Sequence, residues 1–197
     1  MKKITLILFC FSFFLLFNVT SEAQLIRFGI SAGLTDVTAP SQYTNSIADN
    51  GVGFGANLNL GAQARFNLPL VPLTPIVFLN YHMLRGSGTV NTSDIKTSQN
   101  IFSIGAEVEY NILPLPFVKP YVSLEAAINH LGDLSNGITN QGSSTRYGGA
   151  LGIGTVITVL PVVDLDASLK YNMFNLVGKK DGEENINALT FCLAIIF

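Results

Sequence analysis

The side chains that could carry out chemistry are few, and the carboxylates are the first candidates. Glu107 and Glu109 lie two residues apart, and Glu125 follows in the next apolar segment. Paired carboxylates can serve as general acid and base in catalysis. In an extended strand, however, residues i and i+2 point to the same face, so any strand with one polar face produces this spacing. The pair therefore does not by itself indicate an enzyme.

The two histidines do not complete a catalytic motif. His130 is followed by Leu131, Gly132 and Asp133, and no neighbouring serine suggests a nucleophilic triad. His82 lies in an alternating segment whose parity places it with the polar residues. No cluster of His, Cys, Asp and Glu has the spacing of a zinc site. We therefore expect no catalytic residue, no metal ion and no cofactor.

Segments of alternating apolar and polar residues must position these side chains. Between Val52 and Phe66 every even position is apolar, whereas the odd positions are Gly, Asn, Gln or Arg. A period of two is typical of a strand with two different faces. These fifteen residues would reach roughly 50 Å, and a tilted strand needs only about 9 to 11 residues to cross a bilayer. The pattern predicts a strand of a membrane β-barrel.

Seven further segments alternate in the same way, so the sequence predicts an all-β, eight-stranded antiparallel up-and-down barrel. Short proline-bearing turns follow the second, fourth and sixth segments, and longer polar stretches follow the first, third, fifth and seventh. Long and short connections are then expected at opposite ends of the barrel. The predicted strands are 25–34, 52–67, 76–84, 101–112, 121–130, 146–159, 165–173 and 187–197, with long loops at 35–51, 85–100, 131–145 and 175–186.

The scarcity of charge indicates which face of the barrel is apolar. Charged residues make up 12% of the chain, against about 25% in typical soluble proteins. A soluble lipocalin-type barrel would turn its polar face to water, and that face would here consist largely of Gly, Asn, Ser and Ala. We therefore expect the apolar face to meet lipid. The aromatic girdles would comprise Phe54, Tyr81, Phe102, Tyr147 and Tyr171 at one rim and Phe28, Phe66, Tyr110 and Phe197 at the other.

The strand parity then predicts a charged lumen. An eight-stranded barrel is just wide enough for side chains to fill it, which favours a salt-bridged plug over a pore. A narrow porin for ions or small solutes is the alternative. The predicted luminal charge network consists of Arg27, Arg65, Glu107, Glu109, Glu125 and Lys170, with Arg146, Asp164 and Asp166 also facing inward.

The beginning of the chain predicts a secretory signal peptide over residues 1–23. Lys2 and Lys3 precede an apolar stretch from Ile4 to Phe17, which is too short to span a membrane as a helix. Cleavage after Ala23 would leave one barrel domain, residues 24–197, with a net charge of about −3. Such a mild negative charge gives no basic footprint for nucleic acid.

With eight strands, a signal peptide and a terminal aromatic residue, the chain resembles the small outer-membrane β-barrel family that includes OmpA-like and OmpX-like domains. The resemblance implies a bacterial outer-membrane location with both termini periplasmic. It also implies that the last strand is an assembly signal, recognised by the barrel assembly machinery. That signal consists of Leu189, Phe191, Leu193, Ile195 and Phe197. The absence of Trp departs from the family pattern, so Tyr and Phe must supply the girdles.

These observations predict a monomeric barrel that is not an enzyme. Its role would be structural, adhesive or partner-docking, through four mobile external loops on a rigid scaffold. The expected partners are outer-membrane lipid and lipopolysaccharide around the belt, and an envelope or extracellular protein at the loops. A lipid-modifying outer-membrane enzyme is a second alternative, since some barrels of this kind use His near the lipid boundary.

Overall fold

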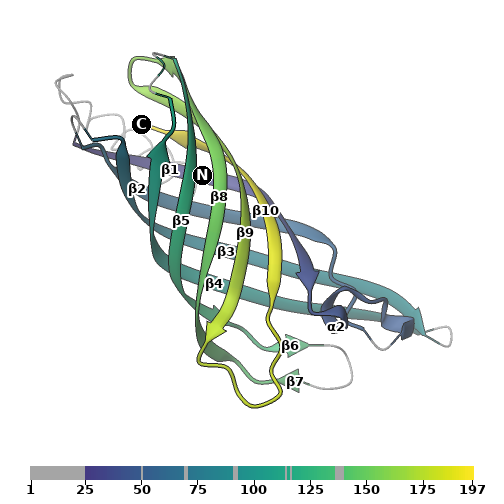
Figure 1. Ribbon diagram of the computed structural model, residues 1–197. Coiled ribbons are helices and arrows are strands. Elements are labelled where there is room, and N and C mark those ends of the chain that lie inside the picture. The colour runs from purple at the N-terminus through teal and green to yellow at the C-terminus, as the bar shows by residue number, and fades with distance from the viewer. Residues whose placement is uncertain are drawn as a thin grey trace, which may run out of the picture.

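The structure is a computed structural model that describes residues 25–49, 51–68, 71–90, 93–113, 115, 117–135 and 140–197. The predicted signal peptide lies outside the described residues. In the described part of the chain, eight long antiparallel strands form the wall of a barrel (Figure 1). They are β1 (Ile26–Ala39), β2 (Ala56–Phe66), β3 (Leu73–Val90), β4 (Ser93–Asn111), β5 (Val118–Leu131), β8 (Ser144–Leu160), β9 (Val163–Val177) and β10 (Asn187–Ile196).

Short elements occupy the connections at one end of the barrel. Helix α2 (Ser41–Thr44) and a 3-10 turn, η1 (Ile47–Asp49), lie between β1 and β2. Strands β6 (Leu134–Ser135) and β7 (Asn140–Gln141), of two residues each, pair with each other between β5 and β8. None of the helices in the described ranges is long and apolar enough to cross a membrane.

The sheet is closed because its first and last strands pair with each other. Strand β1 pairs with β10 from Gly29↔Ile196 to Ala39↔Asn187, and β3 pairs with β4 along the whole hairpin. Each long strand therefore has a partner on both sides, which is how a sheet satisfies its backbone hydrogen bonds in hydrocarbon. The predicted eight-stranded antiparallel barrel is confirmed.

The outer surface of this barrel is an apolar belt. Large outward-facing side chains on all eight strands remain 38–64% exposed, whereas the inward-facing positions carry the buried polar and charged groups. An apolar surface of this extent is characteristic of a protein whose outside is covered by lipid. Val77, Leu79, Ile104, Leu124 and Leu193 are examples from the belt.

The two ends of the barrel differ as expected. Leu25 and Phe197 lie at the same end, where the Phe28 amide donates to the Phe197 carbonyl at 3.0 Å and the Asn67 amide donates to the Leu25 carbonyl at 2.9 Å. The short connections between β2 and β3, β4 and β5, and β8 and β9 are at this end too. We call it the terminal end, and the opposite one the loop end.

The predicted long loop 85–100 is wrong, because this segment is a continuous part of the β3–β4 hairpin. The ladder runs without a break from Leu73↔Tyr110 to Val90↔Ser93, and the hairpin projects beyond the neighbouring strands in Figure 1. The apolar alternation stops near Leu84 because the outer face becomes polar there. Backbone pairing continues, since it does not require an apolar face.

The predicted strand 52–67 is also wrong at its start. Strand β2 begins at Ala56, and Gly53 adopts a positive φ of 71° that interrupts the extended chain. The alternation therefore changes face. Phe54 is 3% exposed and turned inward instead of joining the outer girdle. The other predicted girdle aromatics remain at least partly exposed: Tyr81, Phe102, Tyr147, Tyr171, Phe28, Tyr110 and Phe197 are exposed, and Phe66 is half-buried.

Candidate functional site

The lumen contains a group of ion pairs centred on Arg65. From β2, Arg65 forms a two-pronged pair with Glu109 of β4, in which Nη1 donates to Oε1 at 2.8 Å and Nη2 to Oε2. The same Nη1 lies 3.3 Å from Asp166 of β9, and the Tyr121 hydroxyl donates to that carboxylate at 2.8 Å. All four side chains are buried. Arg65 thus links three strands, β2, β4 and β9, that do not pair with one another.

A second group places a lysine between two glutamates. Glu107 of β4 and Glu125 of β5 are direct cross-strand partners, an arrangement that is repulsive for two like charges. Lys170 of β9 offsets this repulsion, because its ammonium donates to Glu107 at 2.6 Å and to Glu125 at 3.2 Å. The ammonium also lies 5.8 Å from the centre of the Phe78 ring. One cation therefore serves two carboxylates.

A third pair lies at the terminal end. Arg27 of β1 pairs with Asp164 of β9, and it also donates to the Ile196 carbonyl at 3.2 Å. The structure thus places all six residues of the predicted network at the lumen, divided among three groups. Asp164 and Asp166 complete them. In the described residues, these groups contain three cations and five carboxyl groups.

Neutral hydrogen bonds fill the next level toward the loop end. The His82 Nδ1 lies 2.8 Å from the Thr35 hydroxyl, which also accepts from the Asn59 amide at 3.0 Å. The Thr35 hydroxyl also lies 3.2 Å from the hydroxyl of its cross-strand partner Thr190, to which the Asn172 amide donates at 2.8 Å. His82 faces inward as its parity predicts and is 3% exposed. These contacts make His82 a structural member of a polar network.

An apolar cluster closes the lumen at the loop end, where the sequence predicted only polar side chains. It joins residues from the strand ends to residues from the connections, and Tyr43 packs against it with its ring 5.6 Å from that of Phe54. One sequence signal could have revealed this cluster. Near the loop ends of the strands, positions that the alternation places on the inward face are occupied by apolar residues. In the described residues the cluster comprises Val37, Val52, Phe54, Leu84, Ile101, Leu131, Leu134, Phe174, Ile186 and Ala188.

The connection between β1 and β2 is held inside the barrel mouth by close backbone contact. The Thr97 hydroxyl donates to the Val52 carbonyl at 2.6 Å, and Phe54 forms a single β-bridge with Gly86. A Cβ at Gly86 would lie 2.4 Å from that carbonyl, so only glycine permits this approach. The connection is therefore part of the plug, which corrects its prediction as a mobile loop.

The connection between β9 and β10 is also anchored. Arg146 donates to Glu183 through Nε at 3.0 Å and Nη2 at 2.7 Å, and Asn175 donates to the same carboxylate at 3.0 Å. The hydrogen bonds from Arg146 lower the pKa of Glu183 to about 2 from an ordinary value of 4.5. This second loop is thus fixed by a charge-assisted clamp rather than mobile.

The described residues contain no group of three or more His, Cys, Asp and Glu side chains that could hold a metal ion. The buried carboxylates face arginine, lysine or tyrosine instead. The geometry therefore describes a side-chain plug with three levels: ionic, polar and apolar.

Comparison with solved structures agrees with this architecture. Neisserial surface protein A matches with a TM-score of 0.63 at 19% identity, covering 89% of this chain and 98% of that one. The chain has the fold of a small outer-membrane β-barrel. At this level of identity the likeness concerns the fold alone.

Two further small barrels were matched at lower similarity. Ail of Yersinia pestis has a TM-score of 0.48 at 16% identity, covering 87% of this chain and 97% of that one. The N-terminal β-barrel domain of Pseudomonas aeruginosa OprF has a TM-score of 0.49 at 16% identity, with the same coverages. No protein-family model matches the chain, and no curated protein matches it.

Proposed function

We propose that this protein is a closed outer-membrane barrel that acts as a scaffold, with its loop end exposed outside the cell for docking or adhesion. The observation that carries the proposal is the three-level filling of the lumen. An ionic level around Arg65 and Lys170, a polar level around His82 and an apolar level around Phe54 succeed one another from the terminal end to the loop end. A wall that encloses packed side chains serves as a scaffold rather than as a conduit.

The proposed orientation places both termini in the periplasm. Its support is the difference between the two ends: short turns accompany Leu25 and Phe197, and long connections occupy the other end. Bacterial outer-membrane barrels have short periplasmic turns and longer external loops. A protease added to intact cells should then cleave at the loop end and leave a tag placed next to Leu25, at the terminal end, untouched.

We further propose that the last strand carries the assembly signal. Strand β10 closes the barrel against β1, and its outward face alternates apolar residues up to the terminal aromatic. The barrel assembly machinery would recognise this face before closure, when β10 is still unpaired. The residues concerned are Leu189, Phe191, Leu193, Ile195 and Phe197.

The docking surface in this proposal is the β3–β4 hairpin at the loop end. The hairpin continues as a regular ladder to Val90↔Ser93, and the connection after β9, clamped by Arg146 and Glu183, lies at the same end without forming part of the surface. Ordered recognition elements on a rigid scaffold bind with a smaller loss of conformational entropy than mobile loops. The partner would be an envelope or extracellular protein, and the barrel itself a monomer surrounded by outer-membrane lipid and lipopolysaccharide.

Conductance in planar bilayers tests the closed state. The intact barrel should give no stable channels, because the ionic and apolar levels both block the lumen. Stable channels in the intact barrel that Arg65→Ala leaves unchanged would contradict the plug and favour a narrow porin. Incubation with lipid A or phospholipid should release no acyl chains, and release would favour a lipid-modifying enzyme.

Affinity capture tests the docking role. Envelope proteins are recovered on the intact barrel and on a variant in which 86–97 is replaced by a two-residue turn. A variant with 179–185 shortened provides a matched control at the same end. Recovery of a defined partner should be lost on the hairpin variant alone, and identical recoveries on all three barrels would count against docking by the hairpin.

A further inference from the structure

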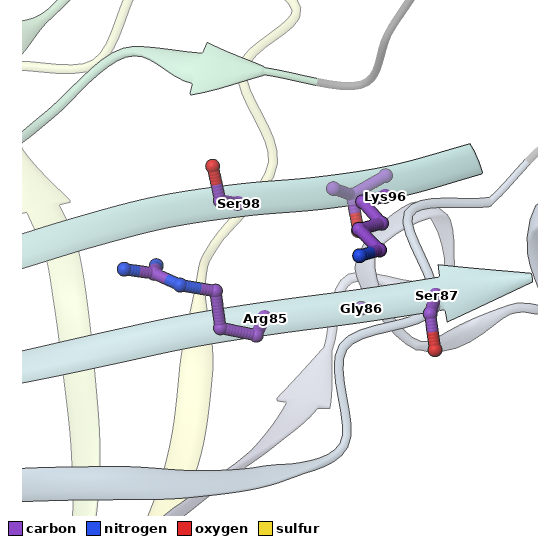
Figure 2. Close-up of a pocket in the computed structure, with 7 residues that line it drawn as sticks. Arg85, Gly86, Ser87, Lys96 and Ser98 are labelled. Carbon is purple, nitrogen blue, oxygen red and sulfur yellow. The ribbon is translucent and has the colours of Figure 1, made fainter. Parts of the chain in front are cut away.

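A hollow lined by two basic side chains lies on the outer wall of the β3–β4 hairpin. Neither the filling of the lumen nor the proposed docking role assigns a function to it. Its volume is about 550 Å³. Figure 2 shows Arg85 on β3 and Lys96 on β4, with the lysine side chain reaching across toward the neighbouring strand near Gly86. The lining residues are Gly53, Arg85, Gly86, Ser87, Lys96, Thr97 and Ser98.

The register places the two cations and two hydroxyl groups side by side. Arg85 is the cross-strand partner of Ser98, and Ser87 is the partner of Lys96. These positions share the outward face of the hairpin, and both Arg85 and Lys96 are exposed. Two cations flanked by hydroxyl donors form a site that is complementary to a phosphate group.

Both cations lack an acidic partner in the part of the chain that the structure describes. The Arg85 guanidinium donates to the Leu84 carbonyl at 2.8 Å and to the Asn100 side-chain oxygen at 2.9 Å, both neutral acceptors. The nearby Asp94 instead accepts from Thr89 at 2.9 Å. The Arg85 guanidinium is therefore held in place by neutral acceptors, and neither Arg85 nor Lys96 is neutralised by a carboxylate of the described residues.

The hollow lies just beyond the aromatic rim of the apolar belt. Tyr81 and Phe102 are cross-strand partners on the same outward face, and both are exposed. Arg85 follows Tyr81 by four positions, which is about 13 Å along a strand and about 10 Å along the membrane normal at a typical tilt. Girdle aromatics mark the membrane interface, so Arg85 is at the depth of lipid headgroups. Lys96, the partner of Ser87 two positions further along β3, is about 5 Å farther out along the membrane normal, and its long side chain reaches back toward Gly86.

We propose that this hollow binds the phosphate of an outer-leaflet lipid whose acyl chains lie against the belt below it. The inference rests on the proposed function, because it requires the loop end to face outward. Continuity of the basic site with the apolar wall favours a lipid over a soluble anion. A lipid places its phosphate against Arg85 and Lys96 while its chains cover Tyr81 and Phe102.

Native mass spectrometry of the folded barrel in neutral detergent tests the site. The protein is titrated with phosphatidylglycerol and, separately, with zwitterionic phosphatidylcholine. The intact barrel should retain phosphatidylglycerol preferentially, and R85Q/K96Q should reduce that preference by at least about tenfold, since each basic residue near a membrane surface contributes about one factor of five. R85Q and K96Q alone should each give an intermediate loss.

The matched control is K179Q/K180Q, which removes the same charge at the same end of the barrel but away from the hairpin. It should retain the preference. Equal losses in both double variants, or no preference in the intact barrel, would refute the site. Complete displacement of the lipid by millimolar inorganic phosphate would also refute the site, because it would indicate a site for a free anion. Binding of heparin through Arg85 and Lys96 without any lipid preference would refute it as well. A barrel that is closed in bilayers yet shows no preference would refute this inference while leaving the scaffold proposal intact.

Discussion

Replacing Arg65 by methionine should strongly destabilise the barrel. Arg65 is 5% exposed and is the cation that pairs with both Glu109 and Asp166. Removal of one partner of a buried ion pair leaves an uncompensated charge, at a cost of about 3–5 kcal/mol. Methionine preserves most of the side-chain volume, so the loss reports the missing charge rather than a cavity. We therefore expect R65M to lower the free energy of unfolding by about 3–5 kcal/mol.

The double variant R65M/E109Q separates charge from packing. Glutamine keeps the shape of Glu109 and removes the carboxylate that would otherwise be buried without its cation. The double variant should therefore recover about 1–3 kcal/mol relative to R65M, a coupling typical of residues in one ion-pair network. Asp166 would still lack its arginine but would keep the Tyr121 hydrogen bond, so recovery should be partial.

The measurement is equilibrium unfolding by urea in lipid vesicles or micelles. The chain has no tryptophan, so far-ultraviolet circular dichroism and the mobility shift of the folded barrel on unheated gels replace tryptophan fluorescence. Arg85→Met provides the control, because this arginine is exposed on the hairpin and should change stability by less than about 0.5 kcal/mol. Equal effects of R65M and R85M, or no recovery in R65M/E109Q, would refute the role assigned to the luminal network.

Three further predictions concern the two ends of the barrel. The lowered pKa of Glu183 means that its pair with Arg146 contributes fully above pH 4.5 and is lost as the pH falls toward about 2. Protection factors for hydrogen exchange in 178–186, which correct for the pH dependence of the intrinsic exchange rate, should fall over that range in the intact chain and stay constant in Glu183→Gln. Phe54→Ala removes a buried ring from the apolar level, so exchange in the β1–β2 connection should increase by an order of magnitude or more, and unchanged protection would contradict the plug. Phe197→Ala should reduce the fraction of folded barrel in outer membranes without changing its stability once folded, and normal assembly would exclude the proposed signal.

The strands and the inward charges were predictable because a period-two pattern carries three-dimensional information directly. Once Val77 and Leu79 are placed outside, Phe78 must point inside, and the same rule places Glu107 and Lys170 in the lumen. Because β4 and β5 are neighbours, an approach of Glu107 and Glu125 was predictable, and their register pairs them directly. Which of Arg27, Arg65 and Lys170 would reach them could not be predicted, because that depends on register and shear between strands far apart in the sequence. The structure gives this role to Lys170.

The failure at Val52 and Phe54 has a specific physical cause. Both fit the alternation of β2, but Gly53, with its positive φ, lets the chain turn before β2 begins at Ala56. Residues before the turn therefore no longer follow the inward and outward alternation of the strand. The hydrophobic pattern indicates that these two side chains avoid water. It does not indicate whether they face lipid or pack inside the mouth of the barrel. Glycines at 53 and 55 permit the turn, yet glycines are also common on the inward face of this barrel, so they did not distinguish the two outcomes.

The apolar and ionic levels depend on each other. Coulombic attraction between buried charges is stronger where water is excluded, and so is the cost of a charge without a partner. The cluster around Phe54, Leu84 and Ile101 restricts the entry of water from the loop end toward the groups of Arg65 and Lys170. Because Phe54 belongs to a connection rather than to the wall, a segment at the loop end helps to set the dielectric environment of the charges inside. The contacts of this connection with Thr97 and Gly86 keep Phe54 in the mouth. Replacing Phe54 should therefore weaken the interior ion pairs even though its side chain does not contact them.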